Sequence, residues 1–444
     1  MLALKGKKIG VLGLGTSGLA AVEYLHQQGA QVYVLSKGEP STWPHFDRLQ
    51  SLDLGKNCFS DRHYFPSEVA AVILSPGISR QHRALRKLKN VPIINEIELA
   101  WPTVQAPVIA VTGSNGKTTT VSLVTALLRG MGKKVFLGGN IGTPLCTYAL
   151  NPTPVDYFVL ELSSFQLESL REFHPQVAVI LNVVANHGER YKTVDAYLAA
   201  KWQITHNLSG HDTFIYPQNL LERKNALPLP LCARVALDLD DGQQALAELS
   251  TVWDLKEFKL PGQHNLLNLY FCYHILKALN LPLAKAQKAL AEFTGVEYRV
   301  SLVPTPLPFK AFNDAKSTNW HATAAAIVSA KAASDPGRPL WLIIGGQRRG
   351  RHDDLAPWLE RFIAQVDKFI LIGDTTEEYY ALLQGRAAVQ RAYDLATAVR
   401  HVLAAGFTGT LLFSPGLPSF DQYPNYVARG KDFATLLAEL GPQA

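Results

Sequence analysis

The sequence predicts an α/β protein built from three domains. The chain has 444 residues, of which 47% are hydrophobic and only 18% charged, so it can form several apolar cores. Short apolar runs alternate with longer segments of helical period, which is the rhythm of β-α-β units. A proline-containing break at 101–107 ends one such series, and a third series begins near Gly295.

The first domain is expected to span residues 1–104. A glycine-rich stretch, Gly13-Leu14-Gly15-Thr16-Ser17-Gly18, follows its first strand, and this pattern by itself suggests a Rossmann-like dinucleotide site. The second strand, however, runs into Ser36-Lys37 instead of an acidic residue, which disfavours NAD. The expected elements are strands at Lys8–Leu12, Val32–Leu35 and Ala71–Leu74, and a helix over Gly18–Gln28.

The central domain, expected at 105–295, carries a phosphate loop. Strand Val108–Val111 runs into Thr112-Gly113-Ser114-Asn115-Gly116-Lys117-Thr118-Thr119, and a helical pattern continues through Leu128. Glycines let backbone N–H groups turn toward phosphate oxygens, Lys117 can reach the terminal phosphates, and Thr118 can bind Mg²⁺. Although Val111 stands where a general P-loop has its first glycine, this order of elements predicts a P-loop ATPase-type domain.

The remaining elements complete the second domain and form the third. Residues 211–259 have irregular signals, and we expect a small antiparallel sheet there. The third domain, expected at 296–444, again alternates strands and helices and is predicted to be Rossmann-like. The expected strands are Tyr157–Leu160 and Val177–Leu181 in the second domain, and Leu340–Ile344, Lys368–Ile372 and Thr410–Phe413 in the third.

Composition and charge indicate which ligands and which cellular location the protein can be expected to have. Lys and Arg total 43 against 37 acids, a net charge of +6 that we take to be spread along the chain, which suits anionic small molecules better than nucleic acid. The four cysteines are far apart, which argues against a zinc site or a disulfide framework and fits a reducing cytoplasm. The N-terminal apolar stretch Ile9–Ala21 is broken by Gly13, Gly15 and Gly18, so we do not expect a signal peptide for export. No later run approaches the ~18 apolar residues of a membrane helix, so membrane insertion is not expected either. The sequence has no long apolar stripe that would need to pack against another subunit, so we expect a monomer.

Several motifs together resemble the Mur ligase family. Residues Thr112–Thr119 are similar to the ATP loop of these ligases and of their folylpolyglutamate synthase relatives. Four further segments resemble the D-glutamate-adding branch in order and spacing, over nearly all 444 residues: Gly139–Gly142, Glu161–Glu168, Asn313–Asn319 and Ser414–Tyr423. The resemblance implies an ATP-dependent ligase that joins D-glutamate to UDP-N-acetylmuramoyl-L-alanine through an acyl phosphate, in cytoplasmic peptidoglycan precursor synthesis.

The resemblance also implies which residues meet ATP and Mg²⁺. Lys117, His187, Lys201 and Arg299 would be catalytic, because making an acyl phosphate mainly requires neutralisation of phosphate charge. Two Mg²⁺ ions are implied, with Thr118, Glu161, His187 and Lys201 as ligands, and with Lys201 carbamylated by CO₂ so that it offers anionic oxygens. The ATP-binding residues would be Gly113, Ser114, Asn115, Gly116, Lys117, Thr118, Thr119, Asn265, Asn268, Arg299 and Asp314.

The other two substrates are assigned by the same resemblance. The first domain would bind the UDP group, and Asn140 with His187 would lie toward the muramoyl end. In the third domain a cation and hydroxyl groups would pair with the side-chain carboxylate of the amino acid. The implied UDP residues are Thr16, Ser17, Ser75, Pro76 and Gly77. The implied amino-acid residues are Lys316, Thr318, Arg349, Ser419 and Phe420.

Several positions depart from the usual pattern of the D-glutamate-adding branch, among them Gly188 and Glu189, where an apolar residue and Asp usually follow the histidine. Asn186 stands where Asp commonly precedes the histidine, Tyr298 and Ser301 replace the usual His and Glu beside Arg299, and Arg348 replaces a frequent Asp. An arginine in place of an acid raises the local positive charge and favours an acidic substrate. The identity and stereochemistry of the added amino acid stay open, because Arg and Lys recognise carboxylates differently.

Three alternative functions remain in view. A related ligase could add another amino acid, such as L-glutamate, or act on folate, although folate is disfavoured by the domain that precedes the ATP domain. A non-catalytic paralogue could bind the precursor and regulate, but it would not need the retained Lys117, Glu161 and Lys201. A nicotinamide dehydrogenase would leave the phosphate loop unexplained.

Overall fold

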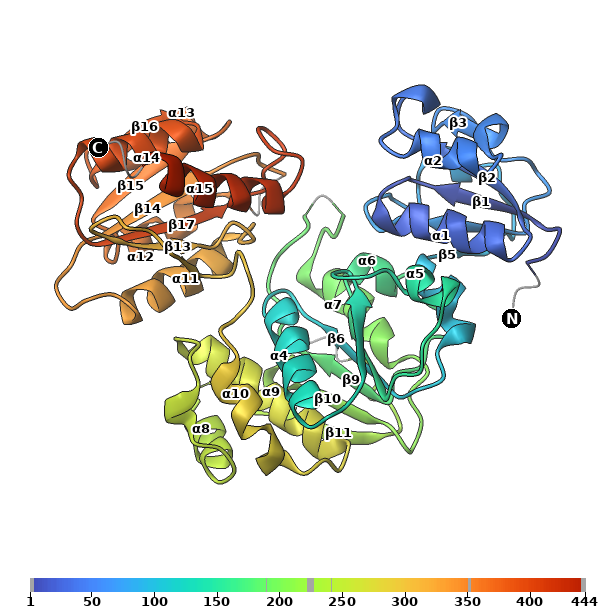
Figure 1. Cartoon of the computed structure of the whole chain (residues 1–444), viewed down its shortest axis with the longest axis horizontal. Coiled ribbons are helices and arrows are strands. Elements are labelled where there is room, and N and C mark those ends of the chain that lie inside the picture. Colours follow the sequence, from blue (N-terminus) through green and yellow to red (C-terminus); the bar gives the residue numbers. More distant parts are fainter. Residues whose placement is uncertain (1–3, 189, 222–226, 241, 350–352, 441–444) are drawn as a thin grey trace. The chain divides into compact units, whose positions relative to one another are not determined.

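The computed structural model describes residues 4–188, 190–221, 227–240, 242–349 and 353–440. The chain divides into two compact units: Met1–Val183, Asp195–Asp241 and Tyr270–Leu290 form the first, and Val184–Val194, Gly242–Leu269 and Ala291–Ala444 the second. The first unit contains two β-sheets and the second contains one, each flanked by helices (Figure 1). The predicted α/β fold class is therefore confirmed. Within the described residues, no helix combines the length and apolarity needed to cross a membrane.

The N-terminal sheet of the first unit has five parallel strands in the order β3-β2-β1-β4-β5. Leu12 of β1 pairs with Leu35 and Leu74, so the carboxyl ends of β1, β2 and β4 meet at one edge. The same three leucines are buried in one core with Phe65. The elements are β1 (Lys8–Leu12), α1 (Thr16–Gln27), β2 (Gln31–Ser36), α2 (Phe46–Ser51), β3 (Cys58–Ser60), β4 (Ala71–Leu74), β5 (Ile93–Ile94) and α3 (Glu96–Ala100).

The central sheet has six parallel strands in the order β11-β10-β9-β6-β8-β7, and α4 packs on β6, β7 and β8. Parallel strands that are covered on both faces need apolar residues throughout, and all five residues of β6 are buried. The elements are β6 (Val108–Thr112), α4 (Lys117–Gly130), β7 (Val135–Gly139), α5 (Leu145–Leu150), β8 (Tyr157–Glu161), α6 (Ser164–Leu167), β9 (Val177–Ile180), α7 (Val194–Trp202), β10 (Thr213–Pro217) and β11 (Ala233–Leu237).

The small antiparallel sheet expected within 211–259 is wrong. Strands β10 and β11 pair in parallel with each other, and β10 pairs in parallel with β9, so both extend the central sheet. Four consecutive residues of β10 are buried, whereas a strand of a half-exposed antiparallel sheet would alternate between buried and exposed residues. In the part of the chain that the structure describes, the antiparallel pair is instead that of β12 and β13.

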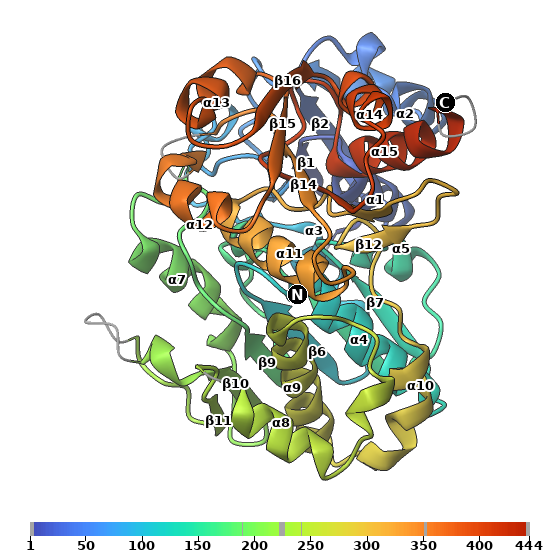
Figure 2. The ribbon, with the colours of Figure 1, turned by 90° about the vertical axis from the view of Figure 1, so that its left-hand side faces the viewer.

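The sheet of the second unit is mixed, with the order β12-β13-β17-β14-β15-β16. Successive residues of β14 serve opposite faces: Leu342 and Ile344 pack with α11, whereas Ile343 packs with α14 and α15. Figure 2 shows α14 and α15 side by side on this second face. The elements are β12 (Ser301–Val303), β13 (Lys310–Asn313), α11 (Trp320–Ala332), β14 (Leu340–Gly345), α12 (Leu359–Ile363), β15 (Lys368–Ile372), α13 (Thr376–Leu383), β16 (Val389–Tyr393), α14 (Leu395–Ala404), β17 (Thr410–Gly416) and α15 (Tyr426–Leu440). Helices α8 (Gln243–Ser250), α9 (Gln263–Ala278) and α10 (Gln287–Glu292) precede them.

A buried carboxyl group lies where the two sheets of the first unit meet. Glu96, 2% exposed on α3, accepts a 3.0 Å hydrogen bond from the backbone N–H of Cys146 on α5 through Oε2. Its other oxygen, Oε1, is buried and has no hydrogen-bond partner among the described residues. Burial therefore raises the pKa of Glu96 to about 7, even though the hydrogen bonds from Cys146 and Leu145 act in the opposite direction.

Replacement of Glu96 by Gln should remove a pH-dependent loss of stability. The folded state holds the proton of Glu96 more tightly than the unfolded state, so this group contributes less to stability as the pH rises from about 4.5 to about 7. Above that range the ionised carboxylate costs up to roughly 3 kcal/mol, a cost that a neutral amide avoids. Urea unfolding at pH 5.5 and 8.0 measures the free energy of unfolding of the variant and of the unaltered protein. The variant should gain stability relative to the unaltered protein as the pH rises. A difference in free energy that is the same at both pH values would contradict this account.

Candidate active site

The phosphate loop connects the carboxyl end of β6 to the first turn of α4. Gly116, immediately before the helix, has φ of 85°, a left-handed conformation that side chains with a Cβ rarely adopt. Lys117 begins the helix, and its Nζ donates hydrogen bonds of 2.8 Å to the carbonyl of Gly113 and 3.1 Å to that of Ser114. The ammonium group is thus held against the loop by two carbonyls, and Lys117 itself begins α4, whose N-terminal N–H groups and dipole favour anions.

Asn182, which we did not predict from the sequence, fixes the shape of this loop. Its Oδ1 accepts a 2.9 Å hydrogen bond from the N–H of Asn115, and its Nδ2 donates a 3.0 Å bond to the carbonyl of the same residue. The N–H of Ser114 also donates to the carbonyl of Asn182, at 2.9 Å. The only sequence signal was its position just after the apolar run of β9, where parallel strands end beside the loop.

Two oxygen ligands suited to a hard cation meet beside the loop. The hydroxyl of Thr118, on α4, donates a 2.7 Å hydrogen bond to Oε2 of Glu161 at the end of β8. The amide of Asn140 donates a 2.9 Å bond to Oε1 of the same carboxylate. Thr118 is 4% exposed and Glu161 is 1% exposed. The structure therefore brings together three predicted residues from three separate segments.

Lys201 is a buried lysine next to this group. Its Nζ, on α7, donates a 2.8 Å hydrogen bond to the carbonyl of Gly113 and lies 3.3 Å from the hydroxyl of Thr112. Burial, and then the charge of Lys117, keep the pKa of the amine well below its ordinary value, although Glu161 acts in the opposite direction. A lowered pKa favours the neutral amine over the ammonium ion, and the neutral amine is the form that reacts with CO₂.

The described residues contain no group of three His, Cys, Asp or Glu side chains placed to bind a metal ion. A cation at this site would therefore rely on Glu161 together with the hydroxyl of Thr118, and such oxygen donors fit Mg²⁺, which keeps several waters and takes few protein ligands. The donor set fits the predicted magnesium.

The predicted UDP residues lie at the carboxyl edge of the N-terminal sheet. Ser75, after β4, donates a 3.0 Å hydrogen bond to the carbonyl of Gly13, after β1. The N–H of Leu14 lies 3.3 Å from the hydroxyl of Ser36, which ends β2. The remaining predicted residues, Thr16, Ser17, Pro76 and Gly77, are exposed or half-buried on the same two turns. The glycine turn and the loop after β4 thus form one polar edge.

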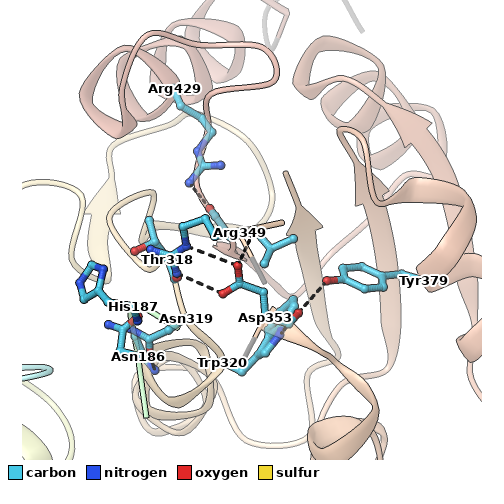
Figure 3. A network of polar contacts seen from close by, with 11 residues as sticks. Asn186, His187, Thr318, Asn319, Trp320, Arg349, Asp353, Tyr379 and Arg429 are labelled. Atoms are coloured by element: carbon cyan, nitrogen blue, oxygen red, sulfur yellow. Dashed lines mark hydrogen bonds and ion pairs between the residues drawn. The ribbon is translucent and has the colours of Figure 1, made fainter. Parts of the chain in front are cut away.

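His187 belongs to the second unit with the rest of segment 184–194. Its backbone is left-handed, with φ of 55°, and its N–H donates a 2.9 Å hydrogen bond to Oδ1 of Asn186. The asparagine that departs from the family pattern therefore caps the unusual turn at the histidine. Figure 3 shows both residues together with Thr318 and Asn319 of the same unit.

Asp314, one of the predicted nucleotide residues, is a buried acid of the second unit. Asp314 accepts hydrogen bonds from the hydroxyls of Ser317, at 2.5 Å, and Ser414, at 2.7 Å, both through Oδ2. Burial raises the pKa of Asp314 to about 6, against the lowering effect of these bonds and of the Arg299 charge. Burial and the same arginine lower the pKa of His264 to about 4, so this imidazole is neutral near pH 7.

Asn265 and Asn268, both predicted to bind ATP, share one face of α9. The amide of Asn268 lies 3.4 Å from Oδ1 of Asn265, whose own amide donates a 2.8 Å hydrogen bond to the carbonyl of Pro261. Residues three apart on a helix are neighbours, which explains the contact.

Arg349 is held by an aspartate that the sequence analysis did not single out. Its guanidinium contacts both carboxylate oxygens of Asp353, with N–O distances of 3.3 and 3.1 Å, and donates a 2.7 Å hydrogen bond to the carbonyl of Thr318 (Figure 3). The Asp353 side chain is only 5% exposed and the Arg349 side chain 20%. The pair thus ties the predicted residue Thr318 to the loop after β14. Its only sequence signal was the spacing of four residues between arginine and acid.

The remaining residues of the predicted amino-acid pocket lie on loops joined by Arg429, which we did not predict from the sequence. Arg429, 1% exposed, donates hydrogen bonds of 3.0 Å to the carbonyl of Ala315 and 2.9 Å to that of Leu417. Lys316 is the residue after Ala315, and its Nζ lies 5.2 Å from the centre of the Tyr426 ring. Beyond the second carbonyl, Ser419 is buried and Phe420 is 64% exposed.

Three of the unusual residues have structural roles here. The hydroxyl of Ser301 accepts a 3.1 Å hydrogen bond from the N–H of Tyr298 and donates one of 3.2 Å to the carbonyl of Asn313, which fixes the turn that carries Arg299. Arg348 forms an ion pair with Glu378. The additional positive charge inferred for Arg348 from the sequence is therefore offset by this acid.

Comparison with known proteins places this architecture in a family. Family models described as Mur ligase MurD-like N-terminal domain and Mur ligase middle domain match residues 7–95 and 111–276. Curated proteins named UDP-N-acetylmuramoylalanine--D-glutamate ligase are similar over almost their whole length. The one from Alkaliphilus metalliredigens is 32% identical, with 99% of both chains covered, and one from Streptococcus pneumoniae is 33% identical, with 98% of both covered.

Two solved structures share the fold at much lower identity. The MurF ligase of Thermotoga maritima in complex with ADP has a TM-score of 0.62 at 15% identity, over 99% of this chain and 96% of that one. The UDP-N-acetylmuramate-alanine ligase MurC of the same organism has a TM-score of 0.59 at 18% identity, over 98% and 100%. With relatives above 30% identity along its whole length, the chain belongs to the Mur ligase family.

Proposed function

We propose that this protein is an ATP-dependent ligase that joins D-glutamate to UDP-N-acetylmuramoyl-L-alanine in peptidoglycan precursor synthesis. The observation that carries the proposal is the agreement, over 98–99% of the chain, with relatives that bear this name. The cluster of Lys117, Thr118 and Glu161 at the phosphate loop supplies the chemistry that such a ligase needs.

We further propose that each sheet serves one substrate. Residues 1–104 bind the UDP group at the edge formed by Thr16, Ser17 and the loop after β4, with Asn140 toward the muramoyl end. Residues 105–295 bind ATP, and 296–444 bind the amino acid. The protein acts in the cytoplasm as a monomer, and light scattering of the purified chain tests the oligomeric state.

The reaction takes place in two steps in this proposal. A carboxylate oxygen of the muramoyl substrate attacks the γ-phosphorus of ATP, the bond from that phosphorus to the bridging oxygen breaks, and ADP leaves. The amine of D-glutamate then attacks the acyl carbon, inorganic phosphate leaves, and the nitrogen loses a proton. Lys117 lies at the phosphates in the first step, where it offsets negative charge as the phosphoryl group moves, and Arg299 is assigned the same task.

Thr118 and Glu161 would hold one Mg²⁺ ion, which supplies positive charge to the phosphate oxygens when bound. We assign Lys201, in carbamylated form, and His187 to a second ion. The neutral amine of Lys201 takes up CO₂ with loss of one proton, which converts a cation that would repel a metal into an anionic oxygen ligand. The depressed pKa and complete burial of this lysine support the assignment.

In the proposed amino-acid site, Arg349 and Lys316 pair with the side-chain carboxylate of D-glutamate, and Thr318, Ser419 and Phe420 complete the pocket. Asp353 would not contact the substrate. It acts as a positioning residue, because its carboxylate fixes the Arg349 guanidinium against the carbonyl of Thr318.

Replacement of Asp353 by Asn should raise KM for D-glutamate by about tenfold or more while kcat changes less, because a misplaced Arg349 weakens substrate binding in the ground and transition states alike. Steady-state kinetics with varied D-glutamate measure this split. Glu378→Gln is the matched control, since it removes the carboxylate partner of the neighbouring Arg348 in a more exposed ion pair. Equal KM values for both variants would show that Asp353 does not position Arg349.

The function itself is tested by phosphate release from the full chain with Mg·ATP and UDP-N-acetylmuramoyl-L-alanine. D-glutamate, L-glutamate and no amino acid are compared. Turnover with D-glutamate alone is expected. Turnover with L-glutamate instead would keep the ligase chemistry but reject the specificity, and no turnover with any amino acid would reject the proposed activity.

A further inference from the structure

Most of the net charge of this protein lies in one short segment, which contains β3, β4 and the loops that follow them. Residues 56–90 contain seven lysines and arginines but only two acids, a balance of +5 in a chain whose total is +6. The surplus of positive charge, which we took to be spread along the chain, is therefore concentrated in this segment, although not as one continuous run. The acids are Asp61, which lies 3.4 Å from His82, and Glu68, which is paired with Lys8 at 3.2 Å.

Four of these cations lie on two adjoining segments, one after β3 and one around the short helix Arg83–Leu85. We call Arg62, Arg83, Arg86 and Lys87 the basic rim, and all four are exposed. Tyr64 joins the segments: the Arg83 guanidinium lies 5.6 Å and the Lys87 ammonium 4.0 Å from the centre of its ring. Arg80 is not part of the rim, because it donates hydrogen bonds toward the central sheet, to the carbonyl of Glu168 and the hydroxyl of Ser169.

Both segments leave the sheet at the edge that carries the glycine turn. Ser60, the last residue of β3, pairs with Ser36 at the end of β2, and Leu74, the last residue of β4, pairs with Leu12 at the end of β1. A Cβ built on Gly13 would lie 2.6 Å from the Ile78 side chain, so the turn touches the loop after β4. That loop then runs through successive turns to His82, which immediately precedes Arg83 of the basic rim.

We propose that the basic rim is an anion-binding surface that captures the diphosphate-bearing substrate as it approaches the glycine turn. This inference rests on the proposed binding of a UDP-linked substrate at that turn. Attraction between charges in water extends over a Debye length of roughly 10 Å at 0.1 M salt. A surface of one sign therefore acts on a diphosphate before close contacts form, and such surfaces raise association rates by about 10- to 1000-fold.

The test is isothermal titration of the full chain, without ATP, with UDP-N-acetylmuramoyl-L-alanine at low and at high salt. The variant Arg83→Glu/Arg86→Glu/Lys87→Glu should bind about tenfold more weakly at low salt, and the difference should shrink at high salt. A second variant, Arg62→Glu/Arg86→Glu, leaves both cation contacts of Tyr64 intact. It should show a smaller effect of the same sign, which separates charge from any local disturbance of the fold.

The matched control is Lys277→Glu/Lys285→Glu/Lys288→Glu, which makes the same change in net charge at three exposed lysines of the first unit, far from the N-terminal sheet in sequence. It should bind nearly as the unaltered chain does. Rim variants that bind with the affinity and salt dependence of this control would overturn the inference alone. If the unaltered chain does not bind the substrate at all, the proposed function falls together with it.

Discussion

Replacement of Lys117 by Ala is expected to lower ATP-dependent phosphate release by about 10³-fold or more. Lys117 begins α4 and is held over the phosphate loop by the carbonyls of Gly113 and Ser114. Without its charge, the phosphoryl group would move with far less electrostatic stabilisation, and single contributions of this kind are worth roughly 10²- to 10⁵-fold in rate. Phosphate release at saturating substrates measures the loss.

Two further variants separate charge from shape at this position. Lys117→Arg keeps the charge but replaces a compact ammonium group by a planar guanidinium, and it should remain strongly impaired. Lys134→Ala removes an exposed lysine just before β7 and should leave turnover unchanged. If Lys117→Ala kept more than a tenth of the activity, the phosphate loop would not have the role assigned to it.

Loss of Lys201 is expected to have the second largest effect, a fall in turnover of about 10²-fold or more. Lys201→Met suits the test because the new side chain has a similar length and no charge, so it fills the same buried space between α7 and the loop carbonyl of Gly113. The variant should stay folded but lack the group that we assign to a carbamate and a second metal ion.

Labelled CO₂ tests the carbamate directly. The unaltered protein, equilibrated with ¹³CO₂, should show a ¹³C carbamate signal, because burial and the charge of Lys117 lower the pKa of the Lys201 amine and so favour the neutral form that reacts with CO₂. Lys201→Met should lack this signal, and Lys134→Ala should retain it. A signal that persists in Lys201→Met, or undiminished turnover of that variant, would rule out the proposed role.

The local pattern of the sequence determined most of the parallel architecture. All nine predicted strands are present, for example β1 at Lys8–Leu12 and β15 at Lys368–Ile372, because a strand covered on both faces forms a nearly continuous apolar run. The phosphate loop was equally clear, since its glycines and lysine occupy fixed positions between a strand and a helix. Short or half-exposed strands such as β3 and β12 have too few apolar residues to be recognised.

The pairing of strands and of distant side chains was decided only by the tertiary structure. The direction of β10 depends on its neighbour β9 and not on its own residues, so the expected antiparallel sheet was wrong. Likewise, the pKa of Lys201 depends on its burial and on Lys117, which is distant in the sequence, and no pattern around either residue encodes that. The apolar pattern of a segment reflects which of its residues must be buried when it folds. Hydrogen bonds and charge interactions between side chains of distant segments form only when the fold brings those segments together. The sequence therefore determined the kinds of elements and the family, and only the folded chain determined the charge state and partners of the residues proposed to act.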